Sequence, residues 1–193
     1  MANIKAVSVF CGTATAVDPA YNAAAVALGQ ALAAAKVTLV YGGAELGLMG
    51  LVAHACFDAG GTVIGIIPDF QMDRELLNPK MTETHIVETM HDRKRLMAEK
   101  CDGFVVLPGG FGTLDEAFEA LTWKYIGLHD KPVVFVDTNG FYQPLLKTVE
   151  HMIATGFSKS WHRNLFTMVA TAAEVLPALE SRPARQDADL SRI

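Results

Sequence analysis

Short β-branched runs alternate with longer segments of helical period along most of the chain. Such runs are typical of buried strands in a parallel sheet, and each is followed by a stretch long enough for a crossover helix. The predicted strands are Ile4–Phe10, Val37–Tyr41, Thr62–Ile67, Phe104–Leu107 and Val133–Val136, with Thr84–Glu88 as a short added strand. The predicted helices are Pro19–Lys36, Leu46–Ala59, His91–Lys100, Leu114–His129 and Phe141–Ala154. This alternation predicts an α/β fold, a Rossmann-like, doubly wound and mainly parallel sheet flanked by helices.

Local signals at the ends of the predicted elements agree with this pattern. Asp18 before Pro19 is typical of a helix N-terminus, and Thr171 with Glu174 has the spacing of a capping box. The segment 68–79 holds two prolines among charged residues and is expected to cross one edge of the sheet as a polar excursion. Residues 1–180 are predicted to form one domain, and the polar, aperiodic residues 181–193 a flexible C-terminal tail.

Composition narrows the classes of protein by exclusion. Apolar residues make up 51% of the chain and charged residues 19%, which indicates a globular protein. A formal net charge of −5 argues against general nucleic-acid binding, and the longest apolar stretch, residues 20–35, is too short and too rich in alanine to span a membrane. Three cysteines without a Cys-x-x-Cys pair favour reduced thiols in the cytoplasm over disulfides or a zinc site.

Three loops that follow predicted strands are rich in glycine. They are Cys11-Gly12-Thr13, the segment 42–50 with four glycines, and the segment 108–113 with three. Glycines let the backbone approach a ligand, and the helix that follows offers unpaired N–H groups to a phosphate. For each loop by itself, a simple turn from strand to helix stays open, but the three together favour a phosphorylated small molecule. The chain has no P-loop, and no Gly-x-Gly-x-x-Gly follows the first strand. These absences argue against an ordinary NTPase or dehydrogenase.

Two charged groups admit both a structural and a functional interpretation. Glu116 stands three residues after Thr113, so the pair has the spacing of a capping box, but a carboxylate there could also stabilise a developing oxocarbenium ion or orient water. The segment 90–97 carries three consecutive cations at the start of a helix, where they oppose the helix dipole. These cations either form a solvated face, paired with Glu88, Asp92 and Glu99, or face an anionic ligand.

Pro108 to Glu116 and Met90-His91-x-Arg93-Lys94 fit the paired signatures of a known family, Pro-Gly-Gly-x-Gly-Thr-x-x-Glu and its companion motif. Further segments occur in family-like order, including Phe10-Cys11-Gly12, Gly47-Leu48-Met49-Gly50 and Thr122-Trp123, so the likeness spans about residues 4 to 180. The chain resembles the Lonely Guy family of cytokinin riboside 5'-monophosphate phosphoribohydrolases, often mislabelled lysine decarboxylases. The resemblance implies hydrolysis of the N-glycosidic bond of a nucleoside 5'-monophosphate to free adenine-type base and ribose 5-phosphate.

The resemblance also implies roles for individual residues. It assigns catalysis to Arg93 and Glu116, and the phosphate to Gly109, Gly110, Gly112 and Thr113. The other implied substrate-binding residues are Glu75, Met90, Lys94, Phe111, Leu114, Asp115 and Thr122. It further implies a homodimer that needs no metal or organic cofactor, and it leaves any general acid unnamed. Departures from the plant pattern at Ala14, Ala44-Glu45, Phe111 and Asp115 leave the base selectivity open, so AMP is also a candidate substrate.

Two other functions compete with this hydrolase. A non-catalytic nucleotide-binding or sensing protein would use the same frame and the same glycine-rich loops. A pyridoxal-phosphate lysine decarboxylase would need a Schiff-base lysine, and Lys94 is the only lysine within the motifs. The presence of both Arg93 and Glu116 favours the hydrolase over the sensor.

Overall fold

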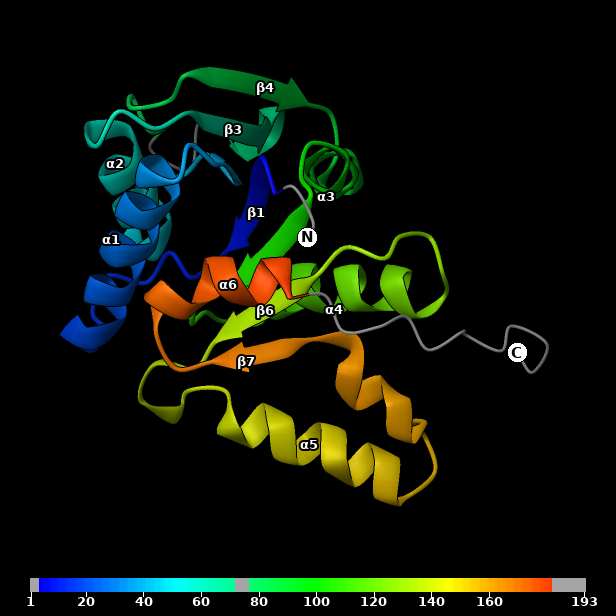
Figure 1. The fold of residues 1–193 in the computed structure, drawn as a ribbon. Coiled ribbons are helices and arrows are strands. Elements are labelled where there is room, and N and C mark those ends of the chain that lie inside the picture. Colours follow the sequence, from blue (N-terminus) through cyan, green and yellow to red (C-terminus); the bar gives the residue numbers. More distant parts are fainter. Residues whose placement is uncertain (1–3, 72–76, 182–193) are drawn as a thin grey trace.

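The computed structural model describes residues 4–71 and 77–181, which form a seven-stranded sheet with helices on both faces (Figure 1). The strands are β1 (Ala6–Phe10), β2 (Thr38–Tyr41), β3 (Val63–Pro68), β4 (Glu83–Val87), β5 (Gly103–Val106), β6 (Val133–Val136) and β7 (Thr167–Val169). Their order across the sheet is β4-β3-β2-β1-β5-β6-β7, and every pair of neighbours is parallel. The predicted doubly wound α/β fold is therefore confirmed.

Each crossover between strands contains a helix or a short turn of helix. The α-helices are α1 (Pro19–Ala34), α2 (Gly47–Asp58), α3 (Met90–Glu99), α4 (Phe111–Tyr125), α5 (Gln143–Ala154) and α6 (Val175–Glu180). The 3-10 helices are η1 (Asp69–Gln71), η2 (Thr138–Gly140), η3 (Ser160–Leu165) and η4 (Ala172–Glu174). The predicted start of α1 is confirmed, because Asp18 accepts a hydrogen bond of 2.8 Å from the Ala20 N–H. The predicted capping box of Thr171 and Glu174 is also confirmed, at the start of η4.

The period-two alternation along the strands divides the core into two layers. One layer contains Val7 and Val9 of β1, packed with buried residues of α1, α2 and α6. The other contains Phe10 of β1 with Val106 and Phe135, packed with buried residues of α3 and α4. The central strands are covered on both faces, as parallel strands require, and their carboxyl ends emerge between the two layers of helices.

Several elements differ from the sequence prediction, among them helix α4 and strand β7. Helix α4 begins at Phe111 rather than Leu114, because Gly110 is already its N-cap, and it ends at Tyr125 rather than His129. Gly127, with φ of +85°, has the left-handed conformation that commonly follows a helix end. Strand β7 is absent from the prediction, since its three half-buried residues are too short a run to give a period. The added strand near residue 84 is confirmed as β4.

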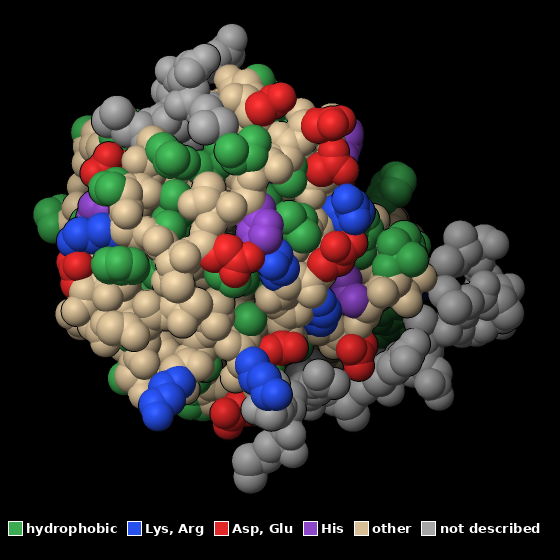
Figure 2. Space-filling model, turned by 90° about the horizontal axis from the view of Figure 1, so that it is seen from above, with side chains coloured by type: hydrophobic (Ala, Val, Ile, Leu, Met, Phe, Trp, Pro, Cys, Tyr) green, Lys and Arg blue, Asp and Glu red, His purple; other side chains and the backbone are tan. Residues whose placement is uncertain are grey.

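Several sequence predictions concern features beyond the sheet. Glu75 and residues 182–193 of the predicted tail lie outside the described residues. Within 4–71 and 77–181, no helix is long and apolar enough to cross a bilayer, and no three metal-binding side chains converge on one point. Acidic and basic side chains are interspersed on the face that Figure 2 shows, with no broad surface of one charge.

Candidate functional site

The strand order changes direction between β1 and β5, and a cavity of about 520 Å³ lies beyond the carboxyl ends of these two strands. The chain continues from β1 to β2 on one side and from β5 to β6 on the other, so the two loops diverge and leave a crevice. The lining residues are Cys11, Gly12, Thr13, Ala14, Val17, Tyr21, Leu48, Met49, Gln71, Met90, Arg93, Pro108, Gly109, Gly110, Phe111, Gly112, Thr113, Asp115, Glu116 and Phe141. All three predicted glycine-rich loops contribute to this wall.

Backbone contacts between the three loops form the floor of the cavity. The Gly12 N–H donates to the Pro108 carbonyl oxygen at 3.1 Å, and the Leu48 N–H donates to the Gly12 carbonyl oxygen at 3.0 Å. A Cβ at Gly109 would lie 2.0 Å from Thr113 Oγ1 and 2.8 Å from the Gly12 nitrogen. Glycine at 109 is therefore required by the packing of the loops, so the turn interpretation is sufficient at that position.

Gly110 and Gly112 have no such packing reason. A Cβ at either position would meet no described atom within 4 Å, and neither residue has a positive φ. Both lie at the first turn of α4, where no side chain among the described residues caps the helix. The first backbone N–H groups of an α-helix have no partner within the helix. The arrangement leaves open space beside the first turn of α4 and the positive end of its dipole, which suits an anion.

Beside this helix end lies a buried ion pair between α3 and α4. Arg93 Nη2 donates to Glu116 Oε1 at 3.2 Å, and the two residues are only 4% and 5% exposed. A Cβ at Gly42 would lie 2.0 Å from Arg93 Nη2, so the glycine after β2 provides the room that the guanidinium occupies. Residues from three crossovers thus position one charged pair at the cavity wall.

The surroundings of Glu116 alter its proton affinity. Burial raises the pKa of the Glu116 carboxyl from 4.5 to about 7, although the nearby charge of Arg93 acts in the opposite direction. Burial also raises the pKa of the neighbouring Cys11 thiol, with the Glu116 charge adding to the shift. A carboxyl group that titrates near neutral pH can accept and release a proton during one reaction cycle.

The structure decides the capping interpretation of Glu116 and shows the partners of the cations in the basic segment. The capping-box interpretation of Thr113 and Glu116 is wrong, because Gly110 is the N-cap of α4 and Glu116 accepts from Arg93 instead. For the basic segment, the surface interpretation holds only for Arg95, which pairs with Asp92 and Glu99 on the helix exterior. The remaining two cations, Arg93 and Lys94, both contact α4.

Lys94 is held by two carboxylates of α4. Its Nζ lies 3.0 Å from Asp115 Oδ2 and 3.1 Å from Glu119 Oε2. Burial alone would lower the pKa of Lys94, but the hydrogen bonds and charges of these two carboxylates outweigh it and the pKa lies above its usual value. A Schiff-base lysine needs a lowered pKa, so these contacts argue against a pyridoxal-phosphate decarboxylase.

The structure brings most of the predicted site residues together around this cavity. Those that line it are Met90, Arg93, Gly109, Gly110, Phe111, Gly112, Thr113, Asp115 and Glu116. Lys94, Leu114 and Thr122 do not line the cavity. Lys94 pairs with Asp115 and Glu119, and Leu114 packs against the core. The Thr122 hydroxyl donates to the Phe118 carbonyl oxygen at 2.7 Å. Their implied roles stay predictions.

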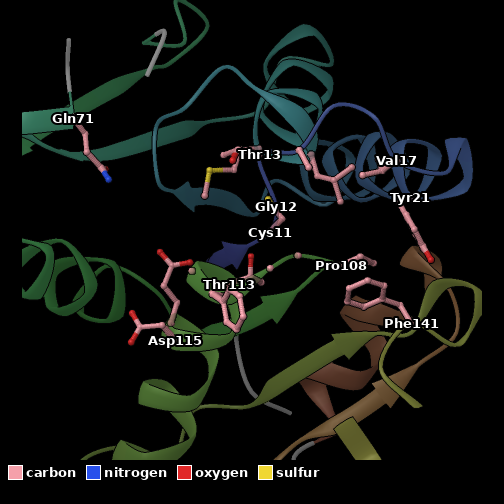
Figure 3. A pocket seen from close by; sticks show the side chains of 18 of the residues that line it. Cys11, Gly12, Thr13, Val17, Tyr21, Gln71, Pro108, Thr113, Asp115 and Phe141 are labelled. Atoms are coloured by element: carbon pink, nitrogen blue, oxygen red, sulfur yellow. The ribbon is translucent and has the colours of Figure 1, made fainter. Parts of the chain in front are cut away.

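Other lining residues carry no motif and were not predicted. Tyr21 of α1 and Phe141 after η2 form an edge-to-face pair, with ring centroids 5.6 Å apart, at one end of the cavity beside Val17 (Figure 3). Gln71 and Asp115 lie toward the opposite end (Figure 3). Gln71 follows the end of β3 by three residues, and ligands bind beyond the carboxyl ends of strands. This position is the one feature of the sequence that indicates a place for Gln71 in the site.

Comparisons with known proteins identify relatives of this chain. The family described as "Possible lysine decarboxylase" matches residues 49–179. The chain is 49% identical over 154 residues to a cytokinin riboside 5'-monophosphate phosphoribohydrolase of Rhodococcoides fascians, covering 79% of this chain and 78% of that protein. It is 42% identical over 176 residues to an Arabidopsis thaliana protein of the same name, covering 91% of this chain and 82% of the relative.

Solved structures share the fold at lower identity. The molybdenum cofactor carrier protein of Chlamydomonas reinhardtii superposes with a TM-score of 0.70 at 23% identity, covering 93% of this chain and 98% of that one. A molybdenum cofactor binding protein of Rippkaea orientalis gives a TM-score of 0.69 at 20% identity, covering 91% and 95%. At these identities the likeness extends to the fold alone, and the choice of ligand depends on the site.

Proposed function

This chain belongs to the Lonely Guy family of cytokinin riboside 5'-monophosphate phosphoribohydrolases, and we propose that it hydrolyses the N-glycosidic bond of N6-substituted adenosine monophosphates and of AMP. The products are the free base and ribose 5-phosphate. The observation that carries this proposal is the buried Arg93–Glu116 pair, which lies in the same cavity wall as the uncapped start of α4. The cavity therefore offers an anion site and a carboxylate side by side.

The phosphate of the substrate would bind at the start of α4. Gly110 and Gly112 leave space for its oxygens, and the unpaired N–H groups of the first helical turn donate to them. Thr113 lines the cavity at the same turn and is 4% exposed. With the phosphate there, the ribose lies one helical turn away, next to Glu116, which is also in the cavity wall.

In the reaction, the bond between C1' of the ribose and the base nitrogen breaks while a water oxygen bonds to C1'. The base leaves with the electron pair and takes up a proton, and one proton of the water is released. As a carboxylate, Glu116 would stabilise the positive charge that develops on the ribose and orient or deprotonate the water. Arg93 stays cationic throughout, so it holds Glu116 and the substrate and donates no proton in the reaction.

The test is the release of free base from AMP and from isopentenyladenosine monophosphate, measured by chromatography for the native chain and for Glu116→Gln. The native chain is expected to release base, and the variant to lose at least about a hundredfold in kcat, since the amide cannot carry the negative charge. Circular dichroism and the melting temperature verify that the variant is folded. Glu150→Gln on the exposed face of α5 is the matched control.

Other outcomes would lead to different conclusions. If the native chain binds AMP but releases no base, the hydrolase proposal fails and a nucleotide-binding or sensing role takes its place. A large preference for the isopentenyl substrate would indicate activation of cytokinins, whereas similar rates on both would indicate a broader turnover of nucleotides. Equal rates for the native chain and Glu116→Gln would remove Glu116 from the mechanism.

Two further proposals come from the family and the surface. We propose a homodimer, supported by apolar side chains exposed on and after α4, namely Phe111 at 95%, Phe118 at 40% and Leu128 at 70%. Sedimentation equilibrium would measure the mass in solution. We also propose a cytoplasmic location, supported by three buried cysteines that form no disulfide. Cell fractionation would test it.

A further inference from the structure

Arg93 makes a second contact that neither the motifs nor the family signature contain. Its Nη1 donates to Gln71 Oε1 at 3.0 Å, while its Nη2 donates to Glu116 Oε1 at 3.2 Å. Gln71 comes from η1, after β3, and Glu116 from α4, so two elements from different crossovers hold the two ends of one guanidinium. The Gln71 side chain also lines the cavity and reaches toward it from the wall formed by β3 (Figure 3).

We propose that Gln71 is a positioning residue, which orients the Arg93 guanidinium toward Glu116 and so sets the charge that Glu116 experiences. This inference rests on the proposed function for its role in catalysis. A guanidinium presents its donors in a rigid fork, so acceptors at Nη1 and Nη2 together fix the plane of the group. An acceptor at Nη2 alone would leave the group free to rotate about that contact.

The choice of a neutral amide at position 71 has an electrostatic consequence. Gln71 accepts from Arg93 Nη1 without adding a charge, and Glu116 is the one carboxylate, among the described residues, that accepts from this guanidinium. A carboxylate at position 71 would compete for Arg93 and would add a like charge near Glu116. Both effects disfavour the ionised form of Glu116.

Other charged or titratable groups also act on Glu116 and must stay unchanged in the test. They are Arg93 and Lys94 from α3, Asp115 and Glu119 from α4, and Cys11 at the end of β1. Substitution of Gln71 removes none of them. Because Gln71 is only half-buried and lies at the cavity rim, its replacement is expected to leave the core intact.

The experiment compares Gln71→Glu and Gln71→Leu with the native chain. The ionisation of Glu116 is followed without substrate, by the carboxyl ¹³C shift of labelled glutamate, with Glu116→Gln identifying the signal. Gln71→Glu is expected to raise the midpoint of this titration by roughly 0.5–1 pH unit, and Gln71→Leu to raise it by a smaller amount, because Arg93 is then no longer held toward Glu116. Gln30→Glu, which adds the same charge on the exposed face of α1, is the control.

Activity provides the second measurement. Gln71→Leu is expected to lower kcat about tenfold with a smaller change in KM, since one hydrogen bond that orients a charged group is lost. In Gln71→Glu, the midpoint of the acidic limb of the pH profile of kcat/KM should move to higher pH, together with the midpoint of the carboxyl titration. A side chain that only supported the fold would change the melting temperature without moving either midpoint.

The inference is overturned if Gln71→Glu titrates at the native midpoint, or if Gln30→Glu moves the midpoint by the same amount. Native turnover rates in both Gln71 variants would likewise overturn the catalytic part. If the native chain releases no base while the carboxyl midpoint moves as expected, the proposed function fails. The positioning of Arg93 by Gln71 would then stand by itself.

Discussion

Burial of Glu116 has a consequence for the stability of the chain that can be calculated from the structure. The pKa of this carboxyl is about 7 in the folded chain against an ordinary value of 4.5, and burial is the main cause. Between these two values the folded chain binds more protons than the unfolded chain, so the free energy of unfolding falls as the pH rises. Each unit of difference between the folded and the ordinary pKa corresponds to about 1.4 kcal/mol. Above pH 7 the ionisation of Glu116 therefore lowers the free energy of unfolding by about 3 kcal/mol relative to acidic pH.

The variant Glu116→Gln removes this titration, because the amide has a similar shape and no ionisation in this range. We expect the free energy of unfolding of the native chain, relative to the variant, to fall by about 3 kcal/mol between about pH 4.5 and about pH 8. For a chain of 193 residues this corresponds to roughly 6–12 °C in melting temperature. The stability penalty and the ionised catalytic carboxylate thus increase over the same pH range.

Urea unfolding at half-unit pH steps measures this difference directly. The free energies of the native chain and Glu116→Gln are subtracted at each pH, which cancels the titration of all other groups. The same subtraction for Glu150→Gln, an exposed glutamate paired with Arg163, reports the effect of removing a charge at the surface. If the native and Glu116→Gln curves run parallel across the range, the reasoning that burial raises the pKa of Glu116 is wrong.

Two other substitutions test separate parts of the structure. Gly110→Ala places a methyl group where the described chain has no atom within 4 Å, so the free energy of unfolding should change by less than about 1 kcal/mol. The Kd for AMP, measured by calorimetry, should rise at least about tenfold, because the methyl group occupies the space of the phosphate. An unchanged Kd would argue against a phosphate at the start of α4. Thr171→Ala removes the capping box of η4 and should lower the free energy of unfolding in urea by about 1 kcal/mol, with kcat unchanged. A loss of activity would show that this distant cap affects the site.

Local patterns in the sequence were sufficient for most of the fold. The β-branched runs predict five strands to within about two residues, because burial on both faces requires continuous apolar residues. The capping signals at Asp18 and at Thr171 with Glu174 operate within four residues and are equally readable. Strand β7 escaped prediction because it is short and only half-buried at the sheet edge.

The candidate site divides in the same way between local and distant information. The glycine-rich loops and the charged motifs could be recognised in the sequence, and the resemblance named Arg93 and Glu116. The spacing of Thr113 and Glu116, however, fits a cap equally well, and only the position of Gly110 at the start of α4 excludes it. Gln71 belongs to no motif, and its contact with Arg93 joins residues 22 positions apart.

The sequence by itself determined the succession of strands and helices, the glycine loops at the strand ends and the family to which the chain belongs. The tertiary structure alone decided which charges are buried and which are paired, since these depend on elements that meet across the sheet. Arg93 and Glu116 come into contact because α3 and α4 pack on the same face of the sheet. Burial in that contact gives Glu116 a proton affinity that its sequence neighbours could not reveal.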